Sequence, residues 1–158
     1  MTKYIPLSLL SILVICGCDL ILNENPPHYI KNVAAYKEGT DGILIYFILA
    51  DESGAMTTSD GSVTITVSET ISKWSSTNDD YIEKDHVLYS TTIGAKKTDF
   101  RKTKIGMGAF ERDAIIFPVG RIEYSLFRSN PSETTGKVKI EFQRPDGKIL
   151  KGEDSIFF

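Results

Sequence analysis

The sequence predicts an all-β fold, an antiparallel β-sandwich of about seven to nine short strands. Three observations predict it: apolar residues recur at every second position through most of the body, clusters of turn-forming residues separate these runs, and no segment has a convincing amphipathic helical period. Residues 29–158 are long enough to bury one hydrophobic core, so we expect a single sandwich domain there.

The predicted strands differ in how their two faces are composed. Residues 42–50 (GILIYFILA) are apolar on both faces, which is typical of a central strand covered on each side. Residues 61–68 and 137–143 alternate apolar with polar side chains, which predicts half-buried strands. Residues 121–127 repeat this alternation, and residues 87–93 show a weaker version of it.

Residues that accept tight-turn backbone angles separate these runs. They occur at residues 51–54 (DESG), 59–61 (SDG), 130–132 (NPS) and 145–147 (PDG). Each cluster therefore marks the end of one predicted strand and the start of another.

Two stretches, residues 41–67 and 136–158, resemble the immunoglobulin-like or fibronectin type III-like modules of bacterial surface proteins. The features that carry the resemblance are the apolar strand, then Asp51 and Gly54, then Asp60 and Gly61 opening an alternating strand, and a terminal hairpin around Pro145, Asp146 and Gly147. The resemblance implies an immunoglobulin-like sandwich that binds or spaces rather than catalyses. Residues 71–100 depart from a compact module of this kind, so we expect an insertion there and leave the strand order open.

The N-terminus has the composition of a secretory signal peptide. Lys3 supplies the positive end, and residues 5–15 (IPLSLLSILVI) supply an apolar stretch of the right length. A spanning helix needs about 20 apolar residues, which this stretch does not reach. We therefore expect residues 1–17 to be a cleaved signal peptide.

Residues 15–18 (ICGC) resemble the lipobox of bacterial lipoproteins with a type II signal peptide. The resemblance implies cleavage before Cys18, a diacylglyceryl thioether on its sulfur, and acylation of its amine. Two or three acyl chains hold a domain stably on a bilayer, so the implied location is the cell membrane or outer membrane, facing the periplasm or the exterior. Asp19 resembles the inner-membrane retention signal of some Gram-negative lipoproteins. The alternative is an ordinary signal peptide followed by a stray cysteine.

Lipidation would leave the exported domain without a disulfide. The chain has two cysteines, of which Cys16 would leave with the signal and Cys18 would carry lipid. The domain therefore depends on its hydrophobic core. Residues 18–28 would form the lipidated cysteine and a tether whose polar, proline-rich part (NENPP) is short, which favours a position near the membrane.

The charge of the chain argues against a nucleic-acid binder. Eighteen Lys and Arg face 21 Asp and Glu, a net charge of −3, whereas nucleic-acid affinity comes from neutralising phosphates. Basic residues concentrate in one place only: Lys96, Lys97, Arg101, Lys102 and Lys104. They indicate either an anionic partner or, as we favour, an edge strand whose lysines discourage pairing with another chain.

Trp74 and Tyr81 flank a polar loop at residues 75–80. Exposed aromatics on a loop commonly recognise proteins or sugars, so these two are candidate binding residues. The favoured alternative is that Trp74 caps a sandwich edge, because large aromatic side chains are usually buried.

No catalytic, metal-binding or cofactor-binding residue is predicted. His28 and His86 have no second histidine or cysteine at ligand spacing, so we expect solvated histidines and no zinc. No nucleophile elbow is present, and the two glycines in residues 105–110 (IGMGAF) indicate a bend rather than a phosphate loop.

Acidic residues gather in two places. The first group is Asp51, Glu52 and Asp60, and the second is Asp79, Asp80, Glu83 and Asp85, together with the amide residue Asn78. Neither group has the spacing of a calcium loop. Turn-forming and solvated carboxylates are the favoured interpretation, and a weak calcium site is left open.

These observations together predict a lipid-anchored binding or accessory module without enzymatic activity. It would contact another envelope protein or a surface ligand through its loops or an edge strand, and the membrane through its lipid. The alternatives are a surface adhesin-like module and a cryptic carboxylate-dependent hydrolase.

Overall fold

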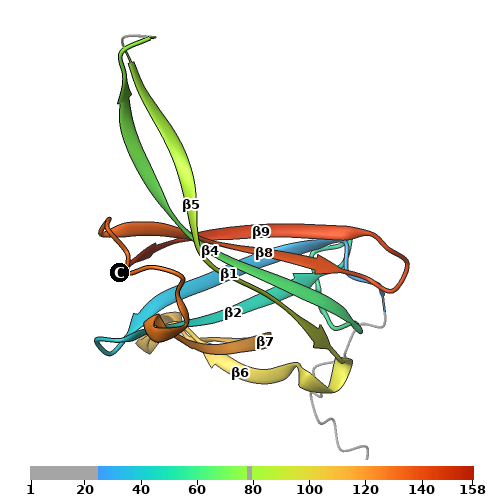
Figure 1. Ribbon diagram of the computed structural model, residues 1–158. Coiled ribbons are helices and arrows are strands. Elements are labelled where there is room, and N and C mark those ends of the chain that lie inside the picture. The colour runs from blue at the N-terminus through green and yellow to red at the C-terminus, as the bar shows by residue number, and fades with distance from the viewer. Residues whose placement is uncertain (1–24, 78–79) are drawn as a thin grey trace, which may run out of the picture.

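The computed structural model describes residues 25–77 and 80–158, with the side chain of residue 80 left out. Within them lie nine strands in two antiparallel sheets, and the sheets form two layers (Figure 1). The all-β prediction is confirmed, and the two layers are consistent with a β-sandwich. The predicted signal peptide, the lipobox at Cys18 and most of the tether lie outside the described residues.

The first sheet has the order β1-β2-β7-β6, with the short β3 also beside β2. Its strands are β1 (Tyr29–Glu38), β2 (Gly42–Ala50), β3 (Met56–Thr57), β6 (Arg101–Ile105) and β7 (Arg112–Glu123). The apolar strand β2 pairs with β1 on one side and with β7 and β3 on the other, as predicted for a central strand.

The second sheet has the order β5-β4-β8-β9. Its strands are β4 (Gly61–Ser75), β5 (Asp80–Ala95), β8 (Thr135–Gln143) and β9 (Ile149–Phe157). Strand β9 lies beside β1 of the first sheet, where the Ala35 amide donates a hydrogen bond of 2.9 Å to Asp154 Oδ2. This contact joins the two sheets at one side of the sandwich.

Three short 3-10 turns complete the described elements: η1 (Lys97–Asp99), η2 (Gly108–Phe110) and η3 (Tyr124–Leu126). The predicted strand at residues 121–127 is therefore only partly correct, since β7 ends at Glu123 and η3 follows. The Tyr124 amide still donates to the Asp41 carbonyl at 2.8 Å, next to the last β2–β7 pair, and the chain then turns where the Phe127 amide donates to the Tyr124 carbonyl at 3.0 Å. No helix within the described residues has the length and apolarity that a membrane crossing needs.

The core lies between the two sheets and follows the predicted alternation. Inward side chains of β2, β4 and β8 are almost fully buried: Ile43, Ile45, Phe47, Val63, Ile65, Val67, Val138, Ile140 and Phe142. The Phe47 ring lies 6.1 Å from that of Phe142 in the other sheet and 5.1 Å from that of Phe117 in its own. Aromatic contacts therefore connect the two layers.

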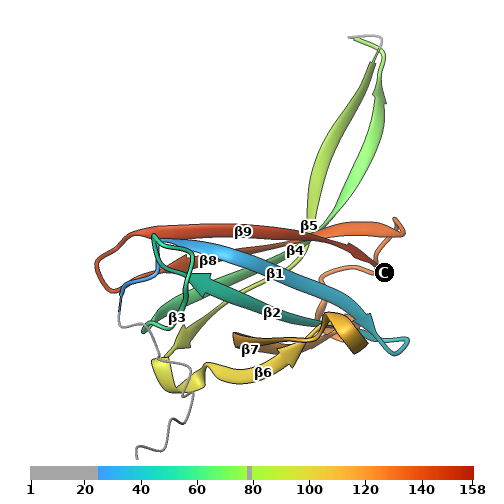
Figure 2. The ribbon, with the colours of Figure 1, turned by 180° about the vertical axis from the view of Figure 1, so that it is seen from behind.

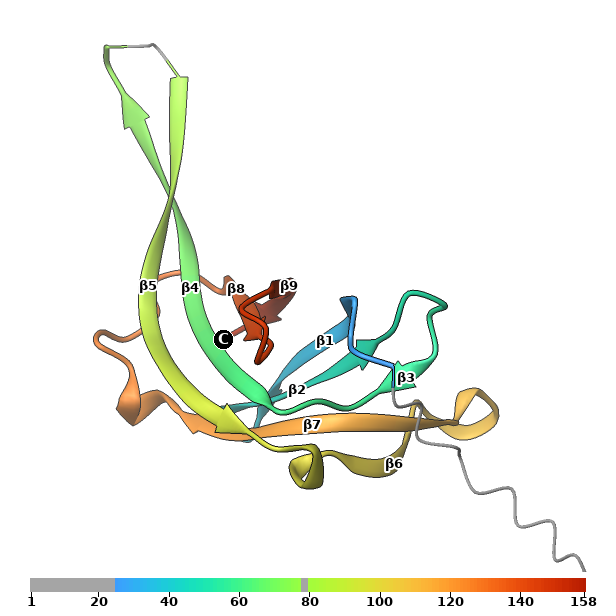
Figure 3. The same cartoon turned by 90° about the vertical axis from the view of Figure 1, so that its right-hand side faces the viewer.

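Strands β4 and β5 are longer than the sheet that contains them. Strand β4 pairs with β8 only as far as Glu69, opposite Gly136, but continues with β5 to Ser75. Beyond Glu69 the two strands form a hairpin that projects from the sandwich (Figures 1 and 2). Figure 3 shows β4 and β5 curving together into this projecting hairpin, with β6 and β7 on the opposite side of the molecule. The expected insertion at residues 71–100 is thus largely an extension of two strands.

Candidate functional site

The projecting hairpin has two chemically different faces, because residues directly opposite each other in antiparallel strands point to the same side. One side carries the pairs Thr70 and Asp85, Ser72 and Glu83, and Trp74 and Tyr81, and we call it the aromatic face. The other carries Ile71 and Lys84, and Lys73 and Ile82, and it starts at Glu69 and His86; we call it the basic face.

Two exposed aromatic residues dominate the aromatic face. Trp74 is 55% exposed and Tyr81 is 63% exposed, and their rings meet edge to face with centroids 5.1 Å apart. They lie on β4 and β5 rather than in a loop. The favoured interpretation of Trp74, burial at a sandwich edge, is wrong, because more than half of Trp74 is exposed and β4 no longer pairs with β8 beyond Glu69.

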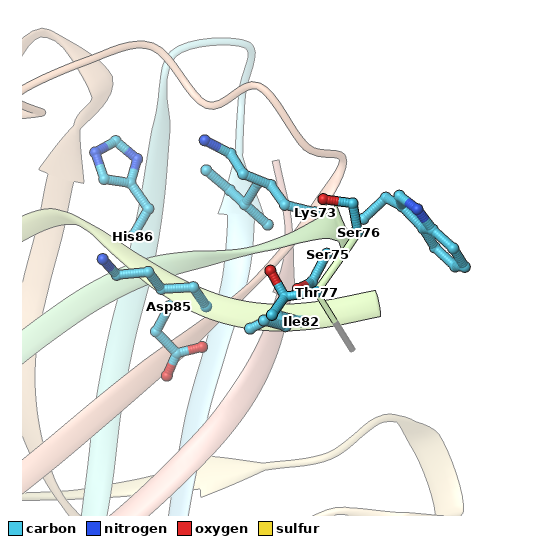
Figure 4. Close-up of a pocket in the computed structure, with 10 residues that line it drawn as sticks. Lys73, Ser75, Ser76, Thr77, Ile82, Asp85 and His86 are labelled. Carbon is cyan, nitrogen blue, oxygen red and sulfur yellow. The ribbon is translucent and has the colours of Figure 1, made fainter. Parts of the chain in front are cut away.

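The basic face borders a hollow of about 500 Å³. Its lining combines the apolar side chains of Ile71 and Ile82 with amines from Lys73 and Lys84 and with small hydroxyl residues near the tip. In Figure 4, Lys73 and His86 point to one side of the hairpin, and the carboxylate of Asp85 points to the other. Trp74, Asp85 and His86 also line the hollow, so it presents apolar, hydroxyl and both kinds of charged side chain, which suits recognition of a polar surface group.

Glu69, which is not among the predicted site residues, fixes the base of the hairpin. Its side chain is 1% exposed, and its carboxylate accepts hydrogen bonds from His86 Nδ1 at 3.0 Å, from the Ser132 amide and hydroxyl at 2.6 and 3.0 Å, and from the Glu133 amide at 3.0 Å. Because a carboxylate only accepts, His86 Nδ1 carries the proton of its bond. The hairpin base is thus tied to the loop that precedes β8.

The electrostatics of Glu69 follow from these contacts. Burial raises the pKa of the carboxyl group, but the hydrogen bonds from His86, Glu133 and Ser132 outweigh burial and hold its pKa at about 2, below the ordinary 4.5. Glu69 is therefore ionised in the folded chain near neutral pH. A charged residue at an inward position of the alternation, two residues after Val67, is the signal in the sequence that could have identified it.

The basic residues predicted as a possible anionic contact lie far from the hairpin. Lys96 precedes η1 and Lys97 lies in it, whereas Arg101, Lys102 and Lys104 lie on β6, which pairs with β7 alone among the described strands. The predicted edge strand is confirmed for Arg101, Lys102 and Lys104, but not for Lys96 and Lys97, which lie outside it. Figures 1 and 3 show β6 and the hairpin tip on opposite sides of the molecule, so the two sets of candidate binding residues do not form one site.

Asp51, in the connection between β2 and β3, has a structural role. Asp51 is 2% exposed and accepts hydrogen bonds from Ser53 Oγ at 2.7 Å, from the Ala55 amide at 3.0 Å and from Asn25 Nδ2 at 3.1 Å. The bond from Ser53, followed by that from Asn25, lowers the pKa of Asp51. Its predicted role as a turn-forming carboxylate is confirmed.

The second acidic group of the sequence is described only in part, since Asn78 and Asp79 lie outside the described residues. Asp85 accepts hydrogen bonds from Lys139 Nζ at 3.0 Å and from Thr70 Oγ1 at 3.2 Å, and the Lys139 bond chiefly lowers its pKa. In residues 25–77 and 80–158, no three His, Cys, Asp or Glu side chains come together as a metal site.

Comparisons with known proteins assign no family to this chain. No family matches, and no curated protein matches. One solved structure that it resembles is Spo0M, a sporulation control protein from Bacillus subtilis, with a TM-score of 0.48 and 8% sequence identity. The match covers 84% of this chain and 49% of that one, so the chain spans about half the length of Spo0M.

Proposed function

We propose that this chain is a lipid-anchored, non-enzymatic binding or accessory module of the cell envelope, which contacts an envelope protein through its projecting hairpin. The observation that carries the proposal is the exposed pair of Trp74 and Tyr81 on strands that have left the sandwich. Trp and Tyr are enriched among the residues that dominate protein interfaces. Exposed apolar surface of this kind contributes nothing to the core, and covering it with a partner is favourable.

The lipid anchor at Cys18 is the second part of the proposal, and it rests on the lipobox and the apolar stretch before it. The anchor would place the domain at the cell membrane or outer membrane. The short polar tether after Cys18 would keep the sandwich close to the bilayer. The hairpin continues for about six residues beyond Glu69, roughly 20 Å, and would extend the distance over which the domain can contact a partner. The sandwich itself, which we infer to be immunoglobulin-like, would serve as the scaffold.

The chemistry of the described acids favours binding over hydrolysis. A carboxylate-dependent hydrolase needs two carboxyl groups facing each other across space for substrate and water. The two buried acids, Asp51 and Glu69, instead accept bonds from their own surroundings, and each stabilises a turn or a loop. We therefore favour a binding module over a carboxylate-dependent hydrolase.

The proposal is tested by purifying the tagged protein from native membranes in mild detergent and identifying its partners by mass spectrometry. Trp74→Ala combined with Tyr81→Ala should release an envelope partner, with a loss of affinity of about 30-fold or more, as for interface residues worth about 2 kcal/mol. Phe157→Ala is the matched control, because Phe157 is an aromatic residue 71% exposed on β9. It should retain the partner.

Two other outcomes would contradict parts of the proposal. A partner that both variants retain would remove the hairpin as the binding site. Binding to a glycan or host surface protein, without an envelope partner, would favour the adhesin-like alternative. The anchor is tested separately: mass spectrometry of the N-terminal peptide should find acyl chains on Cys18, and Cys18→Ala should abolish them.

A further inference from the structure

The connection between β6 and β7 holds two apolar side chains in solvent. Met107 is 85% exposed and Phe110 is 87% exposed, the highest values among the large apolar residues described. The turn is tight: the Phe110 amide donates to the Met107 carbonyl at 3.1 Å, and Gly106 has a φ of 104°. A Cβ at Gly106 would lie 2.5 Å from the Phe110 carbonyl oxygen, so the turn requires glycine there. Both side chains are therefore presented by a defined turn.

An uncovered apolar surface continues from this turn. A hollow of about 890 Å³ lies on the outer face of the first sheet, and its lining includes Tyr36, Leu44, Tyr46, Ile116 and Pro118 together with Met107 and Phe110. Strand β2 was predicted to be covered on each side, but Leu44 and Tyr46 of its outer face are only half-buried. The Tyr46 ring contacts the Tyr36 ring edge to face, with centroids 6.3 Å apart, and both residues line the open hollow. The partly exposed apolar side chains of this face form a patch of the kind that marks an interaction surface.

The charge around this patch has the opposite sign to that of the whole chain. Residues 96–113 contain six Lys or Arg side chains against three Asp or Glu, whereas the chain has a net charge of −3. Arg101, Lys102 and Lys104 are all exposed on β6, directly before the turn, and Arg112 follows it. Acidic residues are present as well, since Glu111 forms an exposed ion pair of 3.9 Å with Lys104 and Asp113 lies opposite Lys104, but the basic residues outnumber them. An apolar tip with an excess of basic neighbours fits a bilayer, whose interior is apolar and whose surface is anionic.

We infer that the β6–β7 turn and the outer face of the first sheet rest on an anionic lipid bilayer, with Phe110 and Met107 inserted at the headgroup level. Basic side chains near the surface attract anionic lipids, and aromatic rings are favoured at the membrane interface. The inference deepens the proposed function, since it concerns how the anchored domain lies on its membrane. Figure 3 shows the β6–β7 turn at the far side of the molecule from the projecting hairpin, so this contact places the hairpin strands that carry Trp74 and Tyr81 away from the bilayer.

Tryptophan quenching by brominated phospholipids tests this orientation, because the chain contains a single Trp. The protein purified from membranes is reconstituted in vesicles that contain phosphatidylglycerol or phosphatidylcholine alone. Phe110→Trp combined with Trp74→Phe places the reporter in the turn, and the unmodified chain, with Trp74 in the hairpin, is the matched control. We expect several-fold stronger quenching of the turn reporter than of Trp74 in phosphatidylglycerol vesicles. Its quenching should be lost when Arg101, Lys102 and Lys104 are changed to glutamine.

Three outcomes overturn the inference: no quenching of the turn reporter, equal quenching in both kinds of vesicle, or quenching of Trp74 alone. Protection of the turn by a co-purifying acidic protein instead of by lipid also overturns it. Circular dichroism and thermal melting of each variant confirm that the sandwich is intact, which is expected for side chains this exposed. Mass spectrometry of Cys18 on the same samples separates this inference from the proposed anchor. Lipid at Cys18 without quenching of the turn reporter contradicts the membrane contact alone, and quenching without lipid at Cys18 contradicts the anchor alone.

Discussion

Replacing Glu69 with glutamine tests how the projecting hairpin is fixed to the sandwich. Glutamine keeps the shape of the side chain and an oxygen that can accept from Ser132 and Glu133, but it removes the charge. Its amide also presents donors to His86 Nδ1, which donates to the carboxylate in the native chain. The substitution therefore weakens charged hydrogen bonds without opening a cavity.

The magnitude follows from the pKa of Glu69, which is about 2 in the folded chain against an ordinary 4.5. Because the folded pKa is the lower one, the ionised carboxylate contributes stability that is complete above pH 4.5 and is lost as the pH falls from 4.5 to about 2. At about 1.4 kcal/mol per pH unit, this contribution is roughly 3 kcal/mol at neutral pH. Glu69→Gln should lower the melting temperature by about 10 °C at pH 7.

Urea unfolding of both proteins from pH 7 to pH 2 measures the effect. The difference in unfolding free energy should be largest above pH 4.5 and should shrink towards zero at the acid end. Glu141→Gln is the control, because Glu141 forms an exposed ion pair of 2.7 Å with Lys151, for which a change below about 1 kcal/mol is expected. A Glu69→Gln protein as stable as the native chain, or a difference that does not vary with pH, would refute the role assigned to the carboxylate.

Three further predictions concern packing. Phe47→Ala should cost about 3–5 kcal/mol in urea unfolding, since Phe47 is fully buried between the sheets; a cost below about 1 kcal/mol would contradict that packing. Gly136→Ala should cost about 1–3 kcal/mol by calorimetry, because its Cβ would lie 2.4 Å from the Ser68 carbonyl oxygen; an unchanged melting temperature would show that β4 and β8 can separate there. Trp74→Ala should change stability by less than about 1.5 kcal/mol, its edge-to-face contact with Tyr81 being the main loss. A larger loss would mean that the hairpin belongs to the core.

The strands and their inward faces could largely be predicted from the sequence. Side chains two residues apart on a strand share a face, so the alternation at Val63, Ile65 and Val67 predicts which side chains are buried, and all three are fully buried. The same local rule fails at residues 121–127, where Leu126 lies in η3 and is 58% exposed. There the strand gives way to a turn in which the Phe127 amide donates to the Tyr124 carbonyl, and the alternation of apolar residues carries no information about that turn.

The candidate site could be predicted only in part. Trp74 and Tyr81 are identified by their residue types, but their exposure depends on where β8 stops pairing with β4, and periodicity carries no information about that. Glu69 was missed because its four hydrogen bonds come from His86 and from a loop more than 60 residues away. The edge position of β6 was predicted correctly. Lysines on an edge strand discourage pairing with another chain, so their concentration in one segment of the sequence indicates an edge strand.

Local features could be predicted from the amino-acid sequence alone: strand alternation, the turns, and the apolar residues that fill the core. The signal peptide and lipobox are local patterns too, and they stay predictions. The tertiary structure alone decided the order of the strands, the projection of the hairpin beyond Glu69, and the uncovered face above Leu44 and Tyr46. The physical reason is how far apart in the sequence the interacting residues lie. Backbone angles and side-chain alternation depend on a few neighbouring residues, whereas sheet order and the covering of a sheet face depend on which distant segments bury their apolar faces together.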